Sequence, residues 1–74
     1  MIIFMETFAK RLKEIMTEQN LSPKELATQI GVNASTISNW LSEKTTPNIS
    51  CLPKLYKALH VRTNYLLGLD DKKR

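Results

Sequence analysis

The sequence predicts one all-helical domain of five short helices, and three observations support this fold class. Apolar residues recur every three or four positions along most of the chain, which is the period of an amphipathic helix. Helix start signals precede several of these stretches, and glycine or asparagine follows them. No stretch alternates apolar and polar residues in the manner of a half-buried strand. A chain of 74 residues is enough for one domain at most.

The first two helices are defined by their ends and by their apolar faces. The first is predicted over residues 7–19, and Asn20, which tolerates a left-handed backbone, ends it. Ser22 and Glu25 have the spacing of a capping box, with proline at the first helical position, and a second helix runs from there to Gly31. The apolar positions on the inner faces of these helices are Phe8, Leu12, Ile15, Met16, Leu26, Ala27 and Ile30.

Three further helices follow. Asn33 is a suitable N-cap for a helix over residues 34–43. The polar loop 44–48 leads to a fourth helix, which begins near residue 50 or 52 and ends at His60. A short helix over residues 63–67 is ended by a glycine. We expect this domain to span residues 6–69, preceded by a leader at residues 1–5 and followed by a charged, solvated tail or linker at residues 70–74.

Composition limits the function of this domain. With 42% hydrophobic residues it can build a small core but has little room for an enclosed catalytic pocket. Eleven Lys and Arg against seven Asp and Glu give a net charge of +4. This charge attracts polyanions such as nucleic acid or anionic lipid, although a basic surface can also serve solubility alone.

Other features argue against secretion, a membrane anchor and a metal site. The apolar residues 1–5 are too few to span a membrane and lack the parts of a signal peptide. Cys51 has no second cysteine and only His60 as a further soft ligand, so we expect it to act as a small hydrophobic residue. We expect a cytoplasmic protein with no cofactor, no metal, no membrane contact and no evident small-molecule ligand.

Residues 23–43 have the spacing of two helices joined by a tight turn, which is a helix-turn-helix. Ala27 is small enough for the two helices to cross closely, and Gly31 accepts the positive φ of the turn. Because Ile37 and Trp40, together with Leu41, face inward at the helical period, the outward face of the second helix is expected to contain Ser35, Thr36, Ser38, Asn39 and Ser42. Small uncharged side chains allow a helix to approach a polyanion and enter a groove about 12 Å wide.

These residues resemble the lambda-repressor and Cro type of helix-turn-helix protein, often called the XRE family. The resemblance runs from Phe8 to Gly68, and the motifs that carry it are LSPKELA at 21–27, GV at 31–32, STISNW at 35–40, PN at 47–48, LYKAL at 55–59 and YLLG at 65–68. It implies a compact five-helix domain that binds double-stranded DNA, with the third helix in the major groove. It also implies a homodimer on a near-palindromic operator and, in many members, repression of transcription.

Carried over by position, the resemblance implies two sets of DNA contacts. The base contacts are Asn33, Ala34, Ser35 and Asn39, although Asn33 also suits an N-cap. The phosphate contacts are Ser22, Lys24, Thr36, Ser42, Lys44, Thr45 and Asn48. Lys24 is included because Pro23, which stands where members commonly have Gln, cannot donate a hydrogen bond. Tyr65 and Leu69 are expected in either the core or a dimer surface, and the other basic residues, among them Lys10, Arg11, Lys13, Lys54 and Lys57, on solvated faces.

The sequence also departs from the family pattern. Met16 and Leu41 replace a common Arg–Glu pair, and we interpret this change as a hydrophobic contact in place of a buried ion pair. Glu43 and His60 replace glycines that end helices, so we expect a left-handed backbone at both positions.

Two other functions are considered. An antitoxin or adaptor that binds another protein would use the same fold, and nothing in the residues excludes it. An enzyme is not expected, because the chain lacks a paired-carboxylate cleft, a Cys–His–acid set, a metal cluster and a phosphate-binding glycine loop.

Overall fold

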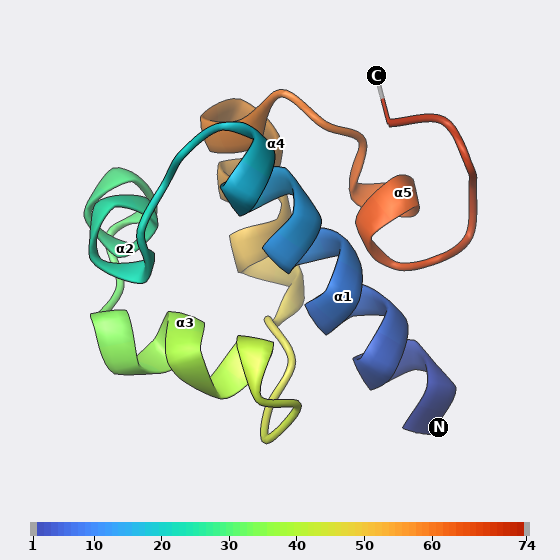
Figure 1. Ribbon diagram of the computed structural model, residues 1–74, viewed down its shortest axis with the longest axis horizontal. Helices are drawn as coiled ribbons and strands as arrows, with labels where there is room; N and C mark the ends of the chain where they lie inside the picture. Colours follow the sequence, from blue (N-terminus) through green and yellow to red (C-terminus); the bar gives the residue numbers. More distant parts are fainter. Residues whose placement is uncertain (1, 74) are drawn as a thin grey trace.

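The computed structural model describes the backbone of residues 2–73 and the side chains of residues 7–73. Its elements, in chain order, are α1 (Ile2–Glu18), α2 (Pro23–Ile30), α3 (Ala34–Leu41), the 3₁₀ helix η1 (Ile49–Cys51), α4 (Leu52–Leu59) and α5 (Thr63–Leu66). The described residues contain no strand, so the predicted all-helical class with five α-helices is confirmed. Figure 1 shows α1 running across the molecule, with α2 and α3 at one end and α5 beside its N-terminal half.

Helix α1 begins five residues earlier than predicted, at Ile2. Residues 2–6 contain neither glycine nor proline, so nothing in the sequence interrupts the propagation of the helix toward the N-terminus. The expected leader is therefore helical over residues 2–5, and Met1 lies outside the described residues. The division into leader, domain and tail otherwise stays a prediction.

The later helix ends follow the expected backbone chemistry. Asn20, Glu43 and His60 have φ of 60°, 66° and 59°, so the left-handed conformation predicted at these helix ends is present. Helix α3 stops at Leu41, two residues before the predicted end, because Glu43 has already left the helical region. The predicted fourth helix is divided into η1 and α4.

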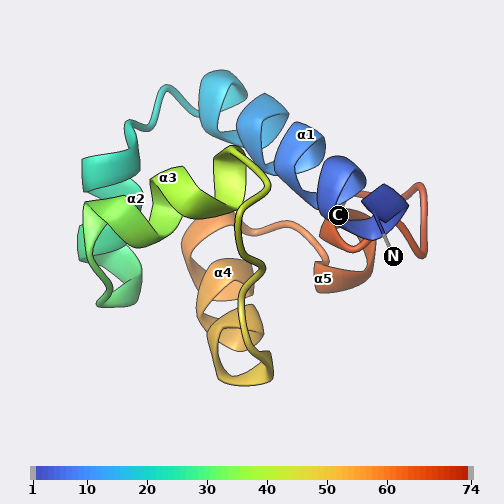
Figure 2. The same cartoon turned by 90° about the horizontal axis from the view of Figure 1, so that it is seen from below.

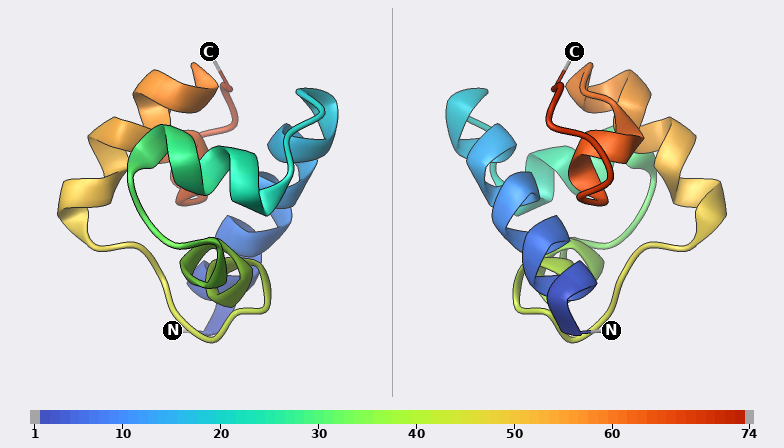
Figure 3. Two further views of the ribbon diagram at one scale, coloured as in Figure 1. Left: turned by 90° about the vertical axis from the view of Figure 1, so that its left-hand side faces the viewer. Right: turned by 90° about the vertical axis from the view of Figure 1, so that its right-hand side faces the viewer.

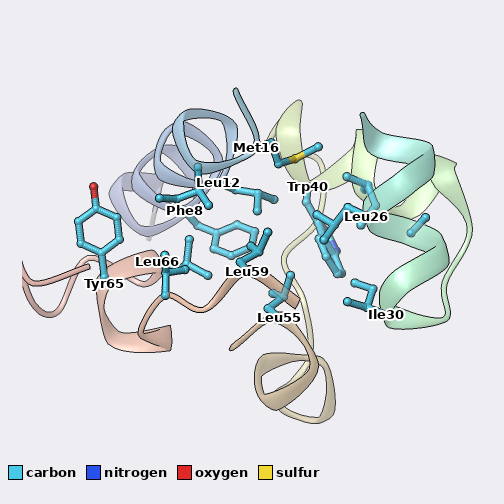
Figure 4. Close-up of a cluster of buried hydrophobic side chains, with 14 residues drawn as sticks. Phe8, Leu12, Met16, Leu26, Ile30, Trp40, Leu55, Leu59, Tyr65 and Leu66 are labelled. Atoms are coloured by element: carbon cyan, nitrogen blue, oxygen red, sulfur yellow. The ribbon is translucent and has the colours of Figure 1, made fainter. Parts of the chain in front are cut away.

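One hydrophobic core joins all five α-helices (Figure 4). Phe8 and Trp40 meet edge to face near its centre, with ring centroids 6.1 Å apart and an interplanar angle of 73°, a favourable aromatic geometry. Met16 is buried and Leu41 packs against the same cluster, so both residues that replace the family's ion pair add to the core. Cys51 also packs against the core but is only partly buried.

The C-terminal residues 70–73 fold back onto the domain through their backbone, while the side chains of Asp71 and Lys72 stay exposed. The Lys73 carbonyl accepts a 2.7 Å hydrogen bond from the Arg62 N–H. The Asp70 carbonyl accepts a 2.8 Å hydrogen bond from Nη1 of Arg11. Arg11 was expected on a solvated face, yet its side chain is only 21% exposed. Arg11 thus joins the C-terminal segment to α1, as does the 3.4 Å ion pair between Lys73 and Glu18.

Candidate nucleic-acid interface

The turn between α2 and α3 has the tight geometry that the sequence predicts. The carbonyl of Ala27 accepts hydrogen bonds from the N–H groups of Gly31 and Val32, at 2.8 and 3.0 Å. Gly31 ends α2 with φ of 79°, and the extended backbone of Asn33 starts α3. Ala27 is only 3% exposed, so its small side chain lies within the packing that joins the two helices. Figure 2 shows α3 crossing the face of the molecule with α2 beside it.

Helix α3 has one buried side and one open side. Ile37 and Trp40 are buried, as predicted. Ala34, Ser35, Ser38 and Ser42 are exposed, and no residue within α3 is charged. The open side of α3 is therefore a row of small side chains that a large, flat or grooved partner can approach closely.

Asn39 is less open than the helical period suggests. It is half-buried, and so is Thr36. The loop after α3 turns back toward Asn39, whose carbonyl accepts hydrogen bonds from the N–H groups of Lys44 and Thr45, at 2.9 and 3.4 Å. This return of the chain shifts the centre of the open face from Asn39 toward Ser35 and Ser38.

Asn33 occupies the N-cap position of α3 but makes no side-chain cap hydrogen bond. Asn33 is thus the N-cap of α3 by position and by its extended backbone, as expected, but its side chain does not accept a hydrogen bond from the first turn. Its side chain is exposed at the start of the open face of α3. The amide remains available for an external partner.

The start of α2 is held by the predicted capping box. The Glu25 N–H donates to Ser22 Oγ at 3.1 Å, and the Ser22 N–H donates to Glu25 Oε1 at 2.8 Å. The hydrogen bond from the Ser22 N–H is the main cause that lowers the pKa of Glu25 below its ordinary value, and the hydrogen bond with the Ser22 side chain is the second. With a carboxylate already at this helix end, exposed Lys24 is the cation of this region that is best suited to an anion.

The loop after α3 carries the other expected phosphate contacts. Lys44 and Thr45 are exposed. Ser42 Oγ donates to the Asn39 carbonyl at 3.3 Å, and Asn48 Oδ1 accepts from Ser50 Oγ at 2.8 Å. The Ser50 bond leaves the NH₂ group of Asn48 able to donate outward. Figure 3 shows this loop at the same end of the molecule as α3, below α2 and α4.

The two residues expected at a dimer surface have different environments. Tyr65 is only 7% exposed, since it packs in the hydrophobic core and Arg11 lies 4.2 Å from the centre of its ring, so it belongs to the core of this chain rather than to an open surface. Leu69 is 74% exposed and stays available. The periodicity of α1 gave no sign of the role of Arg11, because its partners lie more than fifty residues away in the sequence.

The described part of the chain was searched for a metal site and for a membrane-spanning helix. It contains no group of three or more His, Cys, Asp or Glu residues arranged to hold a metal ion. None of its helices is both long enough and apolar enough to cross a membrane.

Comparison with curated proteins identifies regulators as relatives. The chain is 32% identical over 65 residues to the HTH-type transcriptional regulator ImmR of Bacillus subtilis, an alignment that covers 88% of this chain and 51% of the relative. It is 35% identical over 64 residues to the HTH-type transcriptional activator BcrR of Enterococcus faecalis, covering 86% of this chain and 31% of the relative. The chain thus spans about half of the first relative and less of the second.

Solved structures share the fold. The P22 c2 repressor, in a crystal structure with a synthetic operator, aligns with a TM-score of 0.80 and 30% identity over 85% of this chain and 96% of that one. A transcriptional regulator from Listeria innocua aligns with a TM-score of 0.76 and 28% identity over 82% of this chain and 57% of that one. A helix-turn-helix family model matches residues 12–66, which include the turn at Gly31 and the whole of α3. The chain belongs to this helix-turn-helix family, with a lambda-repressor-like fold.

Proposed function

We propose that this chain binds double-stranded DNA sequence-specifically, with α3 in the major groove, and regulates transcription as an operator-binding homodimer. The observation that carries the proposal is the uncharged, exposed row of small residues on α3, held outward by the turn at Gly31. The likeness to a repressor whose structure was solved with an operator supports the same use of this face.

Base recognition is assigned to the exposed start and the middle of α3. Asn33 and Asn39 carry amides that can pair with adenine through two hydrogen bonds. Ala34 can contact a thymine methyl, and Ser35 can donate to or accept from several bases. Because Asn33 is exposed and makes no cap bond whereas Asn39 is half-buried, we assign the larger share of base discrimination to Asn33.

Phosphate contacts are assigned to both sides of α3. Exposed Lys24 on α2 and exposed Lys44 in the following loop supply the positive charge. Contacts of this kind fix the position of a protein on DNA without reading its sequence. The neutral donors around these lysines are Ser22, Thr36, Ser42, Thr45 and Asn48.

A homodimer would form through the side of the molecule that carries α5. In Figure 2, α3 and α5 lie on the same side of α1, with α5 toward the edge of the view opposite to α2, near the N-terminal end of α1. A two-fold axis beside that edge would put both copies of α3 on one face, as two half-sites of a palindrome require. Leu69, directly after α5, is the exposed apolar residue on this side that we assign to the interface.

Selection from a pool of random duplex DNA tests the proposal. We expect enrichment of two inverted half-sites about 34 Å apart, which is one turn of B-DNA. A reporter gene with the selected operator over its promoter should then be repressed by the protein. Failure to enrich any sequence would contradict specific recognition.

A salt titration tests the phosphate contacts separately. The logarithm of the affinity should fall linearly with the logarithm of the salt concentration, and Lys44→Ala should lower the slope by about one for each site contacted. Lys13→Ala on α1 removes the same charge from a residue outside the proposed interface and serves as the matched control. An affinity that does not depend on salt would refute the phosphate assignments.

A further inference from the structure

Glu43, directly after the last residues of α3, has a backbone conformation that does not suit its side chain. Among the described residues, a positive φ occurs at Gly31 and Gly68, at Asn20 and His60, and at Glu43, where φ is 66°. Glycine takes this left-handed conformation freely, and asparagine and histidine are several times enriched in it, whereas glutamate is not. Strained residues of this kind gather at functional sites, so the strain at Glu43 calls for a functional explanation.

The charge of Glu43 is also isolated. It is the only acidic residue between Glu25 and Asp70, a stretch that contains four basic residues, Lys44, Lys54, Lys57 and Arg62. Its side chain is exposed, and the structure gives its carboxylate no hydrogen bond or ion pair with another described residue. No contact within the described part of the chain therefore accounts for a carboxylate at this strained position.

The fold places this carboxylate among the proposed phosphate contacts. Its neighbours Ser42 and Lys44 are both exposed and both assigned to phosphate. The Glu43 N–H donates to the Trp40 carbonyl at 3.2 Å, and the Lys44 N–H donates to the Asn39 carbonyl at 2.9 Å, so the backbone at Glu43 is held at the end of α3. Because neighbouring Cα atoms are about 3.8 Å apart, a phosphate bound by Ser42 lies within about 10 Å of the Glu43 Cα, which is about one Debye length at 0.1 M salt.

We infer that Glu43 is a repulsive residue of the DNA interface, which opposes the phosphate backbone and limits the affinity that does not depend on sequence. The inference rests on the proposed function, because the phosphate contacts beside Glu43 are those proposed there. Charge attraction supplies nearly all non-specific affinity for DNA, whereas base contacts add to it only on the operator. A like charge beside the phosphates therefore leaves the base contacts of α3 as a larger share of the binding free energy.

Two variants separate the charge of Glu43 from its strained backbone. Glu43→Gln removes the charge and keeps the shape and the left-handed conformation, whereas Glu43→Gly removes both the charge and the strain. At low salt, both should bind a random-sequence duplex about threefold more tightly than wild type, which is the factor for one unit charge about 7 Å from a phosphate in water. Only Glu43→Gly should also raise the melting temperature, by about 4–8 °C, because it alone relieves the strain.

Fluorescence anisotropy of the labelled duplex, repeated over a range of salt concentrations, measures the effect. The gain should shrink as salt rises, because the Debye length falls from about 30 Å at 0.01 M to about 10 Å at 0.1 M. On a selected operator the gain should be the same factor for each bound copy, since repulsion by phosphate does not depend on the bases. The matched control is Glu14→Gln, which removes the same charge from an exposed residue of α1 beside Arg11 and Tyr65, and it should change affinity far less.

A second background tests whether Glu43 acts on the phosphate or only on the neighbouring lysine. Lys44→Ala removes the nearest positive charge along the chain. Adding Glu43→Gln to Lys44→Ala should still raise the affinity about threefold, because the proposed repulsion acts on the phosphate directly. A gain that disappears in this background would assign the effect to neutralisation of Lys44 and would overturn the inference.

The outcomes separate the inference from the proposed function. If wild type selects an operator and Glu43→Gln binds no more tightly than Glu14→Gln, the inference is overturned and the proposed function stands. A loss of affinity confined to certain operator bases would show that Glu43 reads sequence, and it overturns the inference in the same way. If wild type enriches no sequence while Glu43→Gln binds random duplex more tightly, sequence-specific recognition is refuted and the repulsion is supported. If neither protein binds duplex DNA, both fail.

Discussion

Gly31 and Gly68 form a matched pair for separating backbone strain from steric crowding. Their φ angles are 79° and 81°, so alanine meets the same conformational penalty at both. Their surroundings differ. A Cβ added at Gly31 meets no atom within 4 Å, whereas a Cβ at Gly68 would lie 2.8 Å from Thr7 Cγ2 and 3.5 Å from Thr7 Cβ.

The structure therefore predicts two different costs. Gly31→Ala should lower the free energy of unfolding by about 1 kcal/mol, the penalty of a left-handed L-residue. Gly68→Ala should add the cost of overpacking, about 1–3 kcal/mol, for a total of about 2–4 kcal/mol. For a domain of this size, each kcal/mol lowers the melting temperature by about 4–8 °C.

Urea and thermal unfolding followed by circular dichroism measure both variants. The Thr7→Ser background removes Cγ2, the atom nearest to the added methyl. In that background, Gly68→Ala should cost about as much as Gly31→Ala, with Thr7→Ser alone as the reference. Equal costs of the two alanines in the wild-type background, or no relief by Thr7→Ser, would refute the close approach of Gly68 to α1.

Three further predictions follow from single contacts. Trp40→Ala should cost about 3–5 kcal/mol of unfolding free energy, because it removes a buried ring that meets Phe8, and chemical denaturation measures this. Hydrogen bonds from Ser22 lower the pKa of Glu25, so their stabilisation is complete above the ordinary value of 4.5 and is lost as pH falls through the lowered pKa; Glu25→Gln, which removes the titrating group, should flatten stability against pH in this acid range, and an unchanged profile would contradict the capping box. Asn33→Ala should leave the melting temperature within about 3 °C, as no cap bond is lost, while weakening operator affinity; a larger fall would indicate a capping role.

The fold was predictable because each helix has its own local signals. The capping box at Ser22, the glycine at Gly31 and the left-handed positions at Glu43 and His60 all depend on chemistry within a few residues. The inward face of α3 was predictable for the same reason, since Ile37 and Trp40 share one side of any α-helix. The start of α1 was not, because no signal marks it and helix propagation alone carried it to Ile2.

The candidate interface was predictable in outline but not in its degree of exposure. The helical period places Asn39 on the outward side of α3. The period says nothing about the loop after α3, whose N–H groups bind the Asn39 carbonyl and bring the chain back over this residue. The same limit applies to Asn33, where residue type and position both suited a cap that the side chain does not form. The seven phosphate assignments still depend on the family resemblance; they are Ser22, Lys24, Thr36, Ser42, Lys44, Thr45 and Asn48.

The residue that sequence reasoning missed most completely is Arg11, and the reason is physical. Its position on the period of α1 lies next to the apolar face, where a long side chain either reaches solvent or covers a neighbour. Its hydrogen-bond acceptors are backbone carbonyls, which no residue type reveals, and they lie 54 and 59 positions away. The one available signal was the choice of arginine among the lysines of α1, since a planar group with several donors suits converging acceptors better than an ammonium does. Here that arginine is one of two side-chain contacts that join the C-terminal segment to α1, the other being the ion pair between Lys73 and Glu18.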